Sequence, residues 1–445
     1  MTKPSHLVIL GGGPAGLSVG YFAQKKGLPF TIYEASHRTG GNCVTFRHGD
    51  FRFDSGAHRF HDKYPEVTKE IKDLLGGDFQ KCNINSQIYA GGKLFDFPLS
   101  PLNLLKKLGL PTFIKALVER LRSQLSRNET NGDFESFVLR AYGKTIAERF
   151  LLNYSEKLWG DSGQNLSSMI AGTRVRGLDL KTFFVEAFRG QAAKIERLDG
   201  TFYYPKLGIG MIAEKLAETC GSKNIQTGSI ITKIFHDQNR IQEVQINGDQ
   251  RIKIDHMVNS LPLGLFIRMM EPVVPEKILS LASSLRFRNL VLVGLFLDRE
   301  MVTENASMYF PEGVFPFTRV YEPKRRSEFM APPGKTSLIV EIPCHKEDKI
   351  WNTKDDEIIR FVLPSLSNIF SIKENEIIDS QVVRLGNAYP VLEKGFEKKV
   401  EEILLFLSRF SNMKLAGRNG KFEYSHSIHN MMKFGKEVID AYVMN

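Results

Sequence analysis

The chain has 445 residues, of which 42% are hydrophobic and 25% charged, with a formal net charge of +10. A chain of this length usually forms more than one hydrophobic core, so two or three packed units are expected. No apolar run approaches the ~20 residues that a membrane helix needs, and the start MTKPSHLVIL lacks the charged and apolar regions of a signal peptide. We therefore expect a cytoplasmic protein with no stable membrane insertion.

The basic residues are spread along the chain and form only short clusters such as KRR at 324–326. Without a module of interleaved aromatic and basic residues, no nucleic-acid partner is expected, and a phosphate-bearing small molecule fits the charge as well. The four cysteines show no CxxC pairing, so we expect reduced thiols with neither a disulfide framework nor a zinc site.

The first segment, HLVILGGGPAGLSVGYFAQKKGLPFTIYEAS, predicts a strand over 7–10, a glycine-rich turn, a helix and a second strand over 30–34. Gly11, Gly13 and Gly16 satisfy G-x-G-x-x-G, in which the glycines permit the tight turn, the approach of a pyrophosphate and close helix packing. Glu34 ends the second strand where an acceptor for ribose hydroxyls belongs. The segment predicts a dinucleotide site, and the acidic Glu34 argues against a 2′-phosphate there.

The next segment, EASHRTGGNCVTF, places Arg38, Gly41 and Asn42 just after the acidic strand end. An NAD-dehydrogenase half-domain would continue with another helix and strand. This sequence lacks that continuation. Its glycine pair after the acidic strand end instead resembles the large FAD superfamily that contains amine oxidases, protoporphyrinogen oxidases and sugar-nucleotide mutases. That resemblance implies FAD as cofactor, with the arginine and the glycine pair contacting its diphosphate and ribityl chain.

The stretch FRFDSGAHRFH at 51–61 predicts a short half-buried strand that ends at a glycine and two histidines. Gly56 lets the chain lie against a flat ligand without interference from a Cβ atom. His58 then lies near a flavin ring; the alternative is that His58 and His61 are surface or core histidines. No Cys, Asp or Glu completes a metal-binding set, so no metal is expected.

Several motifs in one order resemble UDP-galactopyranose mutases. They are GGNCVTF…GAHRFH, NSQIYAGGKLFDFPLSPLNL, FLLNYSEKLWG, TRVRGLDLK, FPFTRVYE, AYP and AGRNGKFEYSHSIHNM. The resemblance covers most of the chain, although Arg174 and Arg176 compete for one matched position and Ala388 stands where compact members often have a second tyrosine.

The resemblance implies a role for each matched residue. Tyr154 would stack near the uracil, and Trp159 would line the sugar pocket. Arg174 and Arg319 would hold the substrate diphosphate, to which Tyr389 and Tyr424 donate their hydroxyls. The remaining assignments are a catalytic role for His58, Arg174 and Arg319, and cofactor contacts from His58, Gly417, Arg418 and His429.

Each of these residues also has a purely structural interpretation. A tryptophan in EKLWG is most often part of a core, and a tyrosine before proline is commonly a loop anchor. Arg319 at a strand end can pair with Glu322 or another acid. Only their joint occurrence favours the functional assignment.

The expected fold is α/β: a Rossmann-like FAD-binding domain, a helical insert and an antiparallel β-sheet substrate domain. The FAD-binding domain is expected in three parts, residues 1–90, 191–275 and 400–445. The helical insert is expected over 95–190 and the antiparallel sheet over 280–395. A basic amphipathic helix in the insert can pack internally or lie on a membrane, and internal packing is the preferred interpretation.

The function expected from the resemblance is a nucleotide-sugar pyranose–furanose mutase. In that family the N5 atom of reduced FAD attacks the anomeric carbon, with no net redox change, and NAD(P)H is a candidate external reductant. The alternative is an FAD-dependent oxidoreductase of amine-oxidase or protoporphyrinogen-oxidase type. The expected partner is a small molecule, preferably a nucleotide sugar, and a homo-oligomer is left open.

Overall fold

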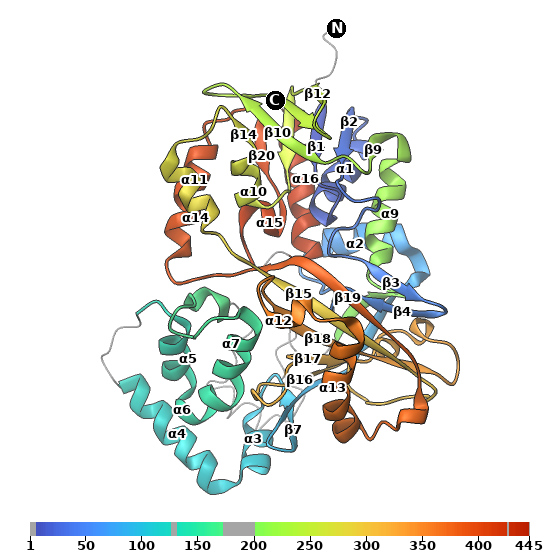
Figure 1. Ribbon diagram of the computed structural model, residues 1–445, viewed down its shortest axis with the longest axis vertical. Coiled ribbons are helices and arrows are strands. Elements are labelled where there is room, and N and C mark those ends of the chain that lie inside the picture. Colours follow the sequence, from blue (N-terminus) through green and yellow to red (C-terminus); the bar gives the residue numbers. More distant parts are fainter. Residues whose placement is uncertain (1–5, 126–130, 172–200, 425–426, 445) are drawn as a thin grey trace.

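The computed structural model describes residues 6–125, 131–171, 201–424 and 427–444. A parallel sheet with its helices forms one end of the elongated molecule in Figure 1, and a helical insert lies at the other end. A large second sheet lies beside the insert, and its longest strands run up toward the first end.

The parallel sheet has five strands in the order β20-β13-β1-β2-β9. The strands are β1 (Leu7–Leu10), β2 (Phe30–Tyr33), β9 (Ile225–Gln226), β13 (His256–Asn259) and β20 (Met413–Leu415). All four residues of β1 are buried, Leu7 and Ile9 in one hydrophobic core and Val8 and Leu10 in another. The helices in the core of Leu7 and Ile9 are α1 (Pro14–Lys25), α9 (Gly210–Cys220) and α16 (Ile428–Met444).

Small residues let these helices approach α1 closely. A Cβ atom on Gly20 would lie 2.9 Å from the Sγ atom of Cys220, and one on Gly435 would lie 2.7 Å from the carbonyl carbon of Ser18. Glycine at both places therefore lets α9 and α16 pack directly against α1.

A smaller four-stranded sheet and several helices complete this end of the molecule. The strands are β10 (Ile231–His236), β11 (Ile241–Ile246), β12 (Gln250–Lys253) and β14 (Met270–Glu271). The helices are α2 (Pro65–Leu75), α10 (Leu263–Arg268), α11 (Glu276–Ser283), α14 (Phe396–Leu407) and α15 (Gly417–Lys421). A two-stranded antiparallel ladder joins β5 (Phe79–Asn83) to β8 (Thr201–Pro205).

The second large sheet has seven strands in the order β19-β15-β18-β17-β16-β6-β7. They are β6 (Ser86–Ala90), β7 (Lys93–Phe97), β15 (Phe287–Leu297), β16 (Ser307–Tyr309), β17 (Arg319–Tyr321), β18 (Thr336–Cys344) and β19 (Ile377–Pro390). Every pair is antiparallel except β16–β6, which is parallel. Residues 86–97 thus extend this sheet, although they come just before the insert in the chain.

Each face of the seven-stranded sheet has its own cover. Helix α13 (Asp355–Phe370) packs its apolar side on one face, and the short α12 (Lys349–Asn352) precedes it. The hairpin of β3 (Thr45–His48) and β4 (Phe51–Asp54) packs on the other, with Phe51 and Phe53 against Phe296. The predicted strand at FRFD is confirmed. It leads directly into the turn that contains His58.

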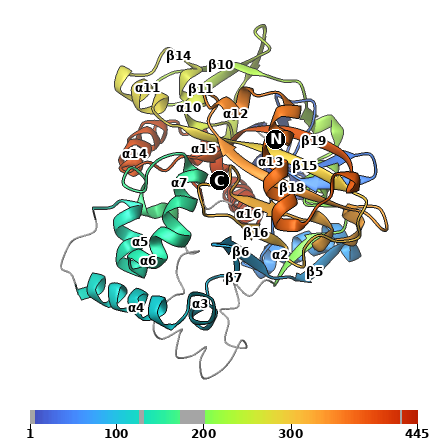
Figure 2. The same cartoon turned by 60° about the horizontal axis from the view of Figure 1, so that its bottom comes forward.

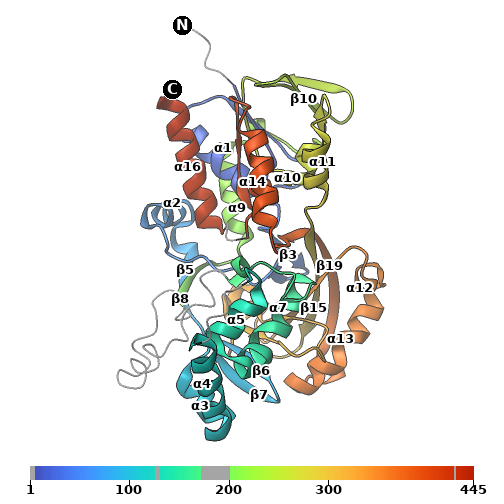
Figure 3. The same ribbon diagram turned by 90° about the vertical axis from the view of Figure 1, so that its left-hand side faces the viewer.

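The insert contains α3 (Pro101–Leu108), α4 (Leu110–Leu125), α5 (Phe134–Tyr142), α6 (Lys144–Ile146), a π-helical turn (Ala147–Leu152) and α7 (Asn153–Trp159). Figure 3 shows α3 and α4 at the outer end and α7 on the side facing the seven-stranded sheet. The expected fold class is confirmed. Within the described ranges, no helix combines the length and apolar character required to cross a bilayer.

Candidate active site

Three glycine loops meet at the start of α1. The amide of Gly40 donates a 2.9 Å hydrogen bond to the Gly12 carbonyl, so the second loop is tied to the first. A Cβ atom on Gly41 would lie 3.2 Å from the Gly13 Cα atom, and one on Gly417 would lie 2.9 Å from the Ala15 Cβ atom. The structure therefore brings the three predicted cofactor loops together.

The first loop fits a pyrophosphate. A Cβ atom on Gly13 would meet only the Gly41 Cα atom within 4 Å, at 3.9 Å, which leaves open space beside the helix N-terminus. Gly16 has a different task, because a Cβ atom there would lie 1.9 Å from the Gly11 carbonyl oxygen. The second glycine thus leaves room for a ligand, and the third permits the strand–helix contact.

Glu34, the predicted ribose acceptor, is held by two backbone amides. Glu34 accepts hydrogen bonds from the Gly12 amide at 2.7 Å and from the Ser36 amide at 2.9 Å. These bonds fix a half-buried carboxylate that retains lone pairs for ribose hydroxyls. Arg38 is exposed and donates to the Gly41 carbonyl at 3.2 Å, so it lies over the glycine pair. These residues together fit the adenosine diphosphate part of FAD.

His58 lies in a polar turn between the cofactor loops and the second sheet. Gly56 has φ +152°, which side-chain-bearing residues rarely adopt. The Ser55 hydroxyl donates to the Asn42 carbonyl at 2.6 Å and lies 3.2 Å from His58 Nε2. Since that hydroxyl proton is already used, the network assigns the imidazole proton to Nε2.

Burial, reinforced by Arg418 and Arg319, lowers the pKa of His58 to about 3. Removal from water disfavours the imidazolium most, and a third arginine, Arg326, adds to the effect of the other two. The His58 ring is therefore neutral at neutral pH and acts as a hydrogen-bonding group, so any stabilising positive charge comes from the arginines.

Arg319 faces Glu341 directly across the β17–β18 pair. Its Nε and Nη2 atoms donate to the two carboxylate oxygens of Glu341, each at 2.8 Å. Glu341 is 2% exposed, and its Oε1 atom also accepts from the Ala57 amide at 2.9 Å. The pair connects the sheet to the turn before His58, and Glu341 balances the charge of Arg319.

An aromatic group forms the next part of the site. Trp159 lies edge-on to Tyr424, with ring centroids 4.8 Å apart, and 6.3 Å from Tyr389. The guanidinium of Arg418 lies 5.9 Å from the Tyr389 ring centroid and 5.8 Å from that of Tyr424, and donates to the Ala388 carbonyl at 3.2 Å. Burial and Glu341 raise the pKa of Tyr389 to about 12, so its hydroxyl remains a donor.

Tyr154 lies on α7, five residues before Trp159. Its ring lies edge-on to Tyr309 with centroids 5.9 Å apart, and Arg319 lies 5.9 Å from the Tyr309 ring centroid. Burial raises the pKa of Tyr154 well above its usual value. Tyr154, Tyr309 and Arg319 therefore form a connected polar and aromatic surface.

Two cations, the partly buried Lys157 and the buried Arg288, hold α7 in place. The ammonium of Lys157 donates to the carbonyls of Phe310, Glu312 and Phe317 at 2.8–2.9 Å, which ties α7 to the segment between β16 and β17. Arg288 donates to the carbonyls of Leu158 and Lys157 at the helix C-terminus, at 3.2 and 3.1 Å. Such carbonyls have no partner within a helix, and a guanidinium also complements the negative end of its dipole.

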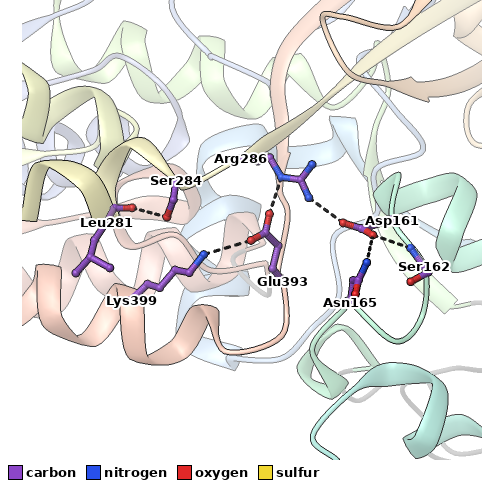
Figure 4. Close-up of polar contacts among 8 residues, drawn as sticks. All are labelled: Asp161, Ser162, Asn165, Leu281, Ser284, Arg286, Glu393 and Lys399. Carbon is purple, nitrogen blue, oxygen red and sulfur yellow. Dashed lines mark hydrogen bonds and ion pairs between the residues drawn. The ribbon is translucent and has the colours of Figure 1, made fainter. Parts of the chain in front are cut away.

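A second polar network continues just beyond α7. Figure 4 shows Arg286 between two acids: its Nη2 atom lies 2.8 Å from Asp161, and its Nε atom lies 2.5 Å from Glu393. Lys399 on α14 reaches Glu393 at 3.4 Å. The loop after α7 is thereby linked to the chain leaving β19 and to the cofactor end of the molecule.

Not every predicted site residue joins this group. Arg174 lies outside the described residues. His429 lies edge-on to Phe60 and Tyr64 and contacts Ser427, away from the arginines and tyrosines above, so its contact with the cofactor stays a prediction. Asn42 donates to the Asn387 carbonyl at 3.4 Å and thus joins the second glycine loop to β19.

The purely structural interpretation of Arg319 is partly correct. Arg319 pairs with an acid, but the acid is Glu341; Glu322 instead accepts from the Thr303 amide and the Thr336 hydroxyl. The sequence interpretation missed Glu341, Tyr309, Lys157 and Arg288. Glu341 had a detectable signal, because it is the one charged residue in the buried apolar run TSLIVEIP.

Comparisons with known proteins agree with this architecture. Coproporphyrinogen III oxidase of Bacillus subtilis (strain 168) is 21% identical over 427 residues, covering 89% of this chain and 90% of that protein. An L-amino-acid oxidase of Crotalus adamanteus is 37% identical over 87 residues, which is 19% of this chain and 17% of that protein.

Among solved structures, reduced UDP-galactopyranose mutase superposes with a TM-score of 0.86 at 20% identity, covering 99% of this chain and 96% of the other. A putative protoporphyrinogen oxidase from Exiguobacterium sp. 255-15 gives 0.78 at 17% identity, with 100% of both chains covered. At these identities the likeness shows the fold. The family model for flavin containing amine oxidoreductases matches residues 14–392, which is most of the sequence. The chain belongs to the flavin containing amine oxidoreductase family, which implies FAD as its cofactor.

Proposed function

We propose that this flavoenzyme is a nucleotide-sugar pyranose–furanose mutase. The observation that carries the proposal is the surface next to His58, where Arg319 and Arg418 accompany four tyrosines and a tryptophan. The four tyrosines are Tyr154, Tyr309, Tyr389 and Tyr424. Guanidinium groups and phenol hydroxyls suit a diphosphate, and aromatic faces suit a base and a sugar.

The protein's own residues would bind and orient the substrate. Bound FAD, in its reduced form, would supply the nucleophile for exchange at the anomeric carbon. Arg418 and Arg319 would retain the diphosphate throughout the reaction, while Trp159 and Tyr154 would fix the sugar and the base. Such positioning lowers the entropic cost of the reaction.

The charge of the site limits how strongly it attracts anions. Arg319 and Arg418 contribute two positive charges and Glu341 one negative charge, which leaves one net positive charge among the three. Because Glu341 uses the Nε–Nη2 edge of Arg319, this arginine would offer a phosphate its remaining Nη1–Nη2 edge. Arg174, if it acts as the resemblance implies, would supply the second unbalanced cation.

A second candidate is an FAD-dependent oxidoreductase. The observation that favours it is the similarity to a coproporphyrinogen III oxidase over 89% of this chain, which supports testing a porphyrinogen as its substrate.

The two candidates differ in the flavin state they need. We would reduce the holoprotein with dithionite under anaerobic conditions, supply UDP-galactofuranose, and separate the products by chromatography. The mutase proposal predicts UDP-galactopyranose from the reduced protein and none from the oxidised protein, with no consumption of reductant. Oxygen-dependent turnover of coproporphyrinogen III by the oxidised protein, without any isomerisation, would refute the mutase and establish the second candidate.

A further inference from the structure

Helix α4 presents a row of large aliphatic side chains to solvent. Its members are 39–82% exposed: Leu110, Ile114, Val118, Leu121 and Leu125. At ~100° per residue these five positions fall within about 80° of arc on one side of the helix. We call this row the α4 stripe. A different side of α4 carries Phe113 and Ala116, which are buried in the insert.

The α4 stripe is therefore a second apolar face, distinct from the face that packs inside the insert. A helix of a globular protein normally shows a single apolar face, directed at its core. Large contiguous apolar patches on a surface usually mark an interaction site, whereas scattered single residues do not.

The charges around the α4 stripe are predominantly positive. Residues 101–125 contain five basic residues and one acid. The acid, Glu119, is already engaged by the Thr145 amide at 2.7 Å and by Lys115 at 3.8 Å. The exposed basic side chains on α3 and α4 are those of Lys106, Lys107, Lys115 and Arg122.

Helix α4, which carries the α4 stripe, lies at one end of the described chain. Figures 1 and 3 show α3 and α4 at the end of the molecule opposite the parallel sheet, and in Figure 2 α4 runs along the periphery of the described chain. A planar surface can approach this end without meeting the cofactor domain.

We propose that α3 and α4 dock this protein on a membrane surface that contains anionic phospholipids. The α4 stripe would enter the region between headgroups and acyl chains, and the neighbouring lysines and Arg122 would contact the phosphates. A second copy of the chain fits less well, because it would place the same basic side chains opposite one another. The contact is peripheral and reversible, since it depends on one amphipathic helix.

The test is co-sedimentation of the full-length holoprotein with vesicles. Vesicles of phosphatidylcholine mixed with phosphatidylglycerol should bind the protein, and phosphatidylcholine alone should bind it much less, with binding reduced by salt. The double variant Ile114→Gln/Leu121→Gln should lower the partition coefficient on the order of tenfold. Its substituted side chains are exposed, and an unchanged flavin spectrum and melting temperature would confirm that it folds.

The matched control is Val273→Gln/Leu405→Gln, which removes two aliphatic side chains, 67% and 72% exposed, outside the insert. This control should bind like the wild type. Absence of vesicle binding, or equal binding by both double variants, overturns the proposal. If the wild type fails to bind and is a dimer that Ile114→Gln/Leu121→Gln makes monomeric, the α4 stripe is an interface between copies.

Discussion

At the scale of single residues, the buried Arg319–Glu341 pair is the group on which the site depends. Removing the guanidinium alone leaves the Glu341 carboxylate almost fully buried without its partner. We expect Arg319→Ala to destabilise the protein by about 3–5 kcal/mol, as for other broken buried ion pairs. Denaturant unfolding of the apo and holo proteins would measure this loss.

A matched double variant separates stability from ligand binding. Arg319→Met/Glu341→Gln removes both charges, and its Gln oxygen can still accept from the Ala57 amide. It should recover most of the lost stability while binding nucleotide sugar more weakly than the wild type. If the double variant is as unstable as Arg319→Ala, the carboxylate is not the source of the cost.

Alanine substitutions at Gly13 and Gly16 test the first glycine loop, where the pyrophosphate of FAD is predicted to bind. Alanine at Gly13 meets open space, so the variant should fold but lose FAD because its methyl group occupies the pyrophosphate position. Alanine at Gly16 would collide with the Gly11 carbonyl, so that variant should be unstable even as apoprotein. Flavin content and apoprotein melting temperature would distinguish them; full FAD binding by Gly13→Ala would contradict the assignment.

At the scale of elements, α7 is positioned by cations that contact backbone carbonyls. Burial lowers the pKa of Lys157 to about 8, so its three carbonyl partners do not fully replace water around the ammonium. We expect Lys157→Met to raise KM for the substrate roughly tenfold, or about 1.4 kcal/mol, with unchanged flavin content. The physical reason is that Tyr154 and Trp159 lose their fixed position relative to Arg319.

The control for this prediction is Lys144→Met, also in the insert, whose exposed side chain pairs with Glu148 at 3.6 Å. Steady-state kinetics should show a normal KM for that variant. An equal rise in KM for both variants, or loss of flavin from Lys157→Met, would contradict a positioning role for Lys157.

Local signals in the sequence predicted the elements whose chemistry is contained within a few residues. The glycine loops, Glu34 and the strand before His58 belong to this class, because short spacing alone determines their geometry. Glu341, Lys157 and Arg288 act through contacts with residues far away in the chain. Their partners depend on the β17–β18 register and on the docking of α7, which no local pattern specifies.

At the scale of the whole molecule, the candidate site joins all three units of the fold. The cofactor domain supplies His58 and Arg418, the seven-stranded sheet supplies Arg319, Glu341 and Tyr389, and the insert supplies Trp159. The network of Arg286 with Asp161 and Glu393 links the loop after α7 to the cofactor end (Figure 4). Substrate binding should therefore change the surroundings of Trp159 in the insert.

Tryptophan fluorescence offers the most direct measurement of the central proposal, that this surface binds a nucleoside diphosphate. The sequence contains two tryptophans, and Trp351→Phe leaves Trp159 as the single reporter, edge-on to Tyr424 in the site. Titration of this holoprotein with UDP should change the emission of Trp159 with saturation, and the affinity should fall as salt rises. Unchanged emission at saturating UDP, with a clear response to coproporphyrinogen III, would contradict the proposal.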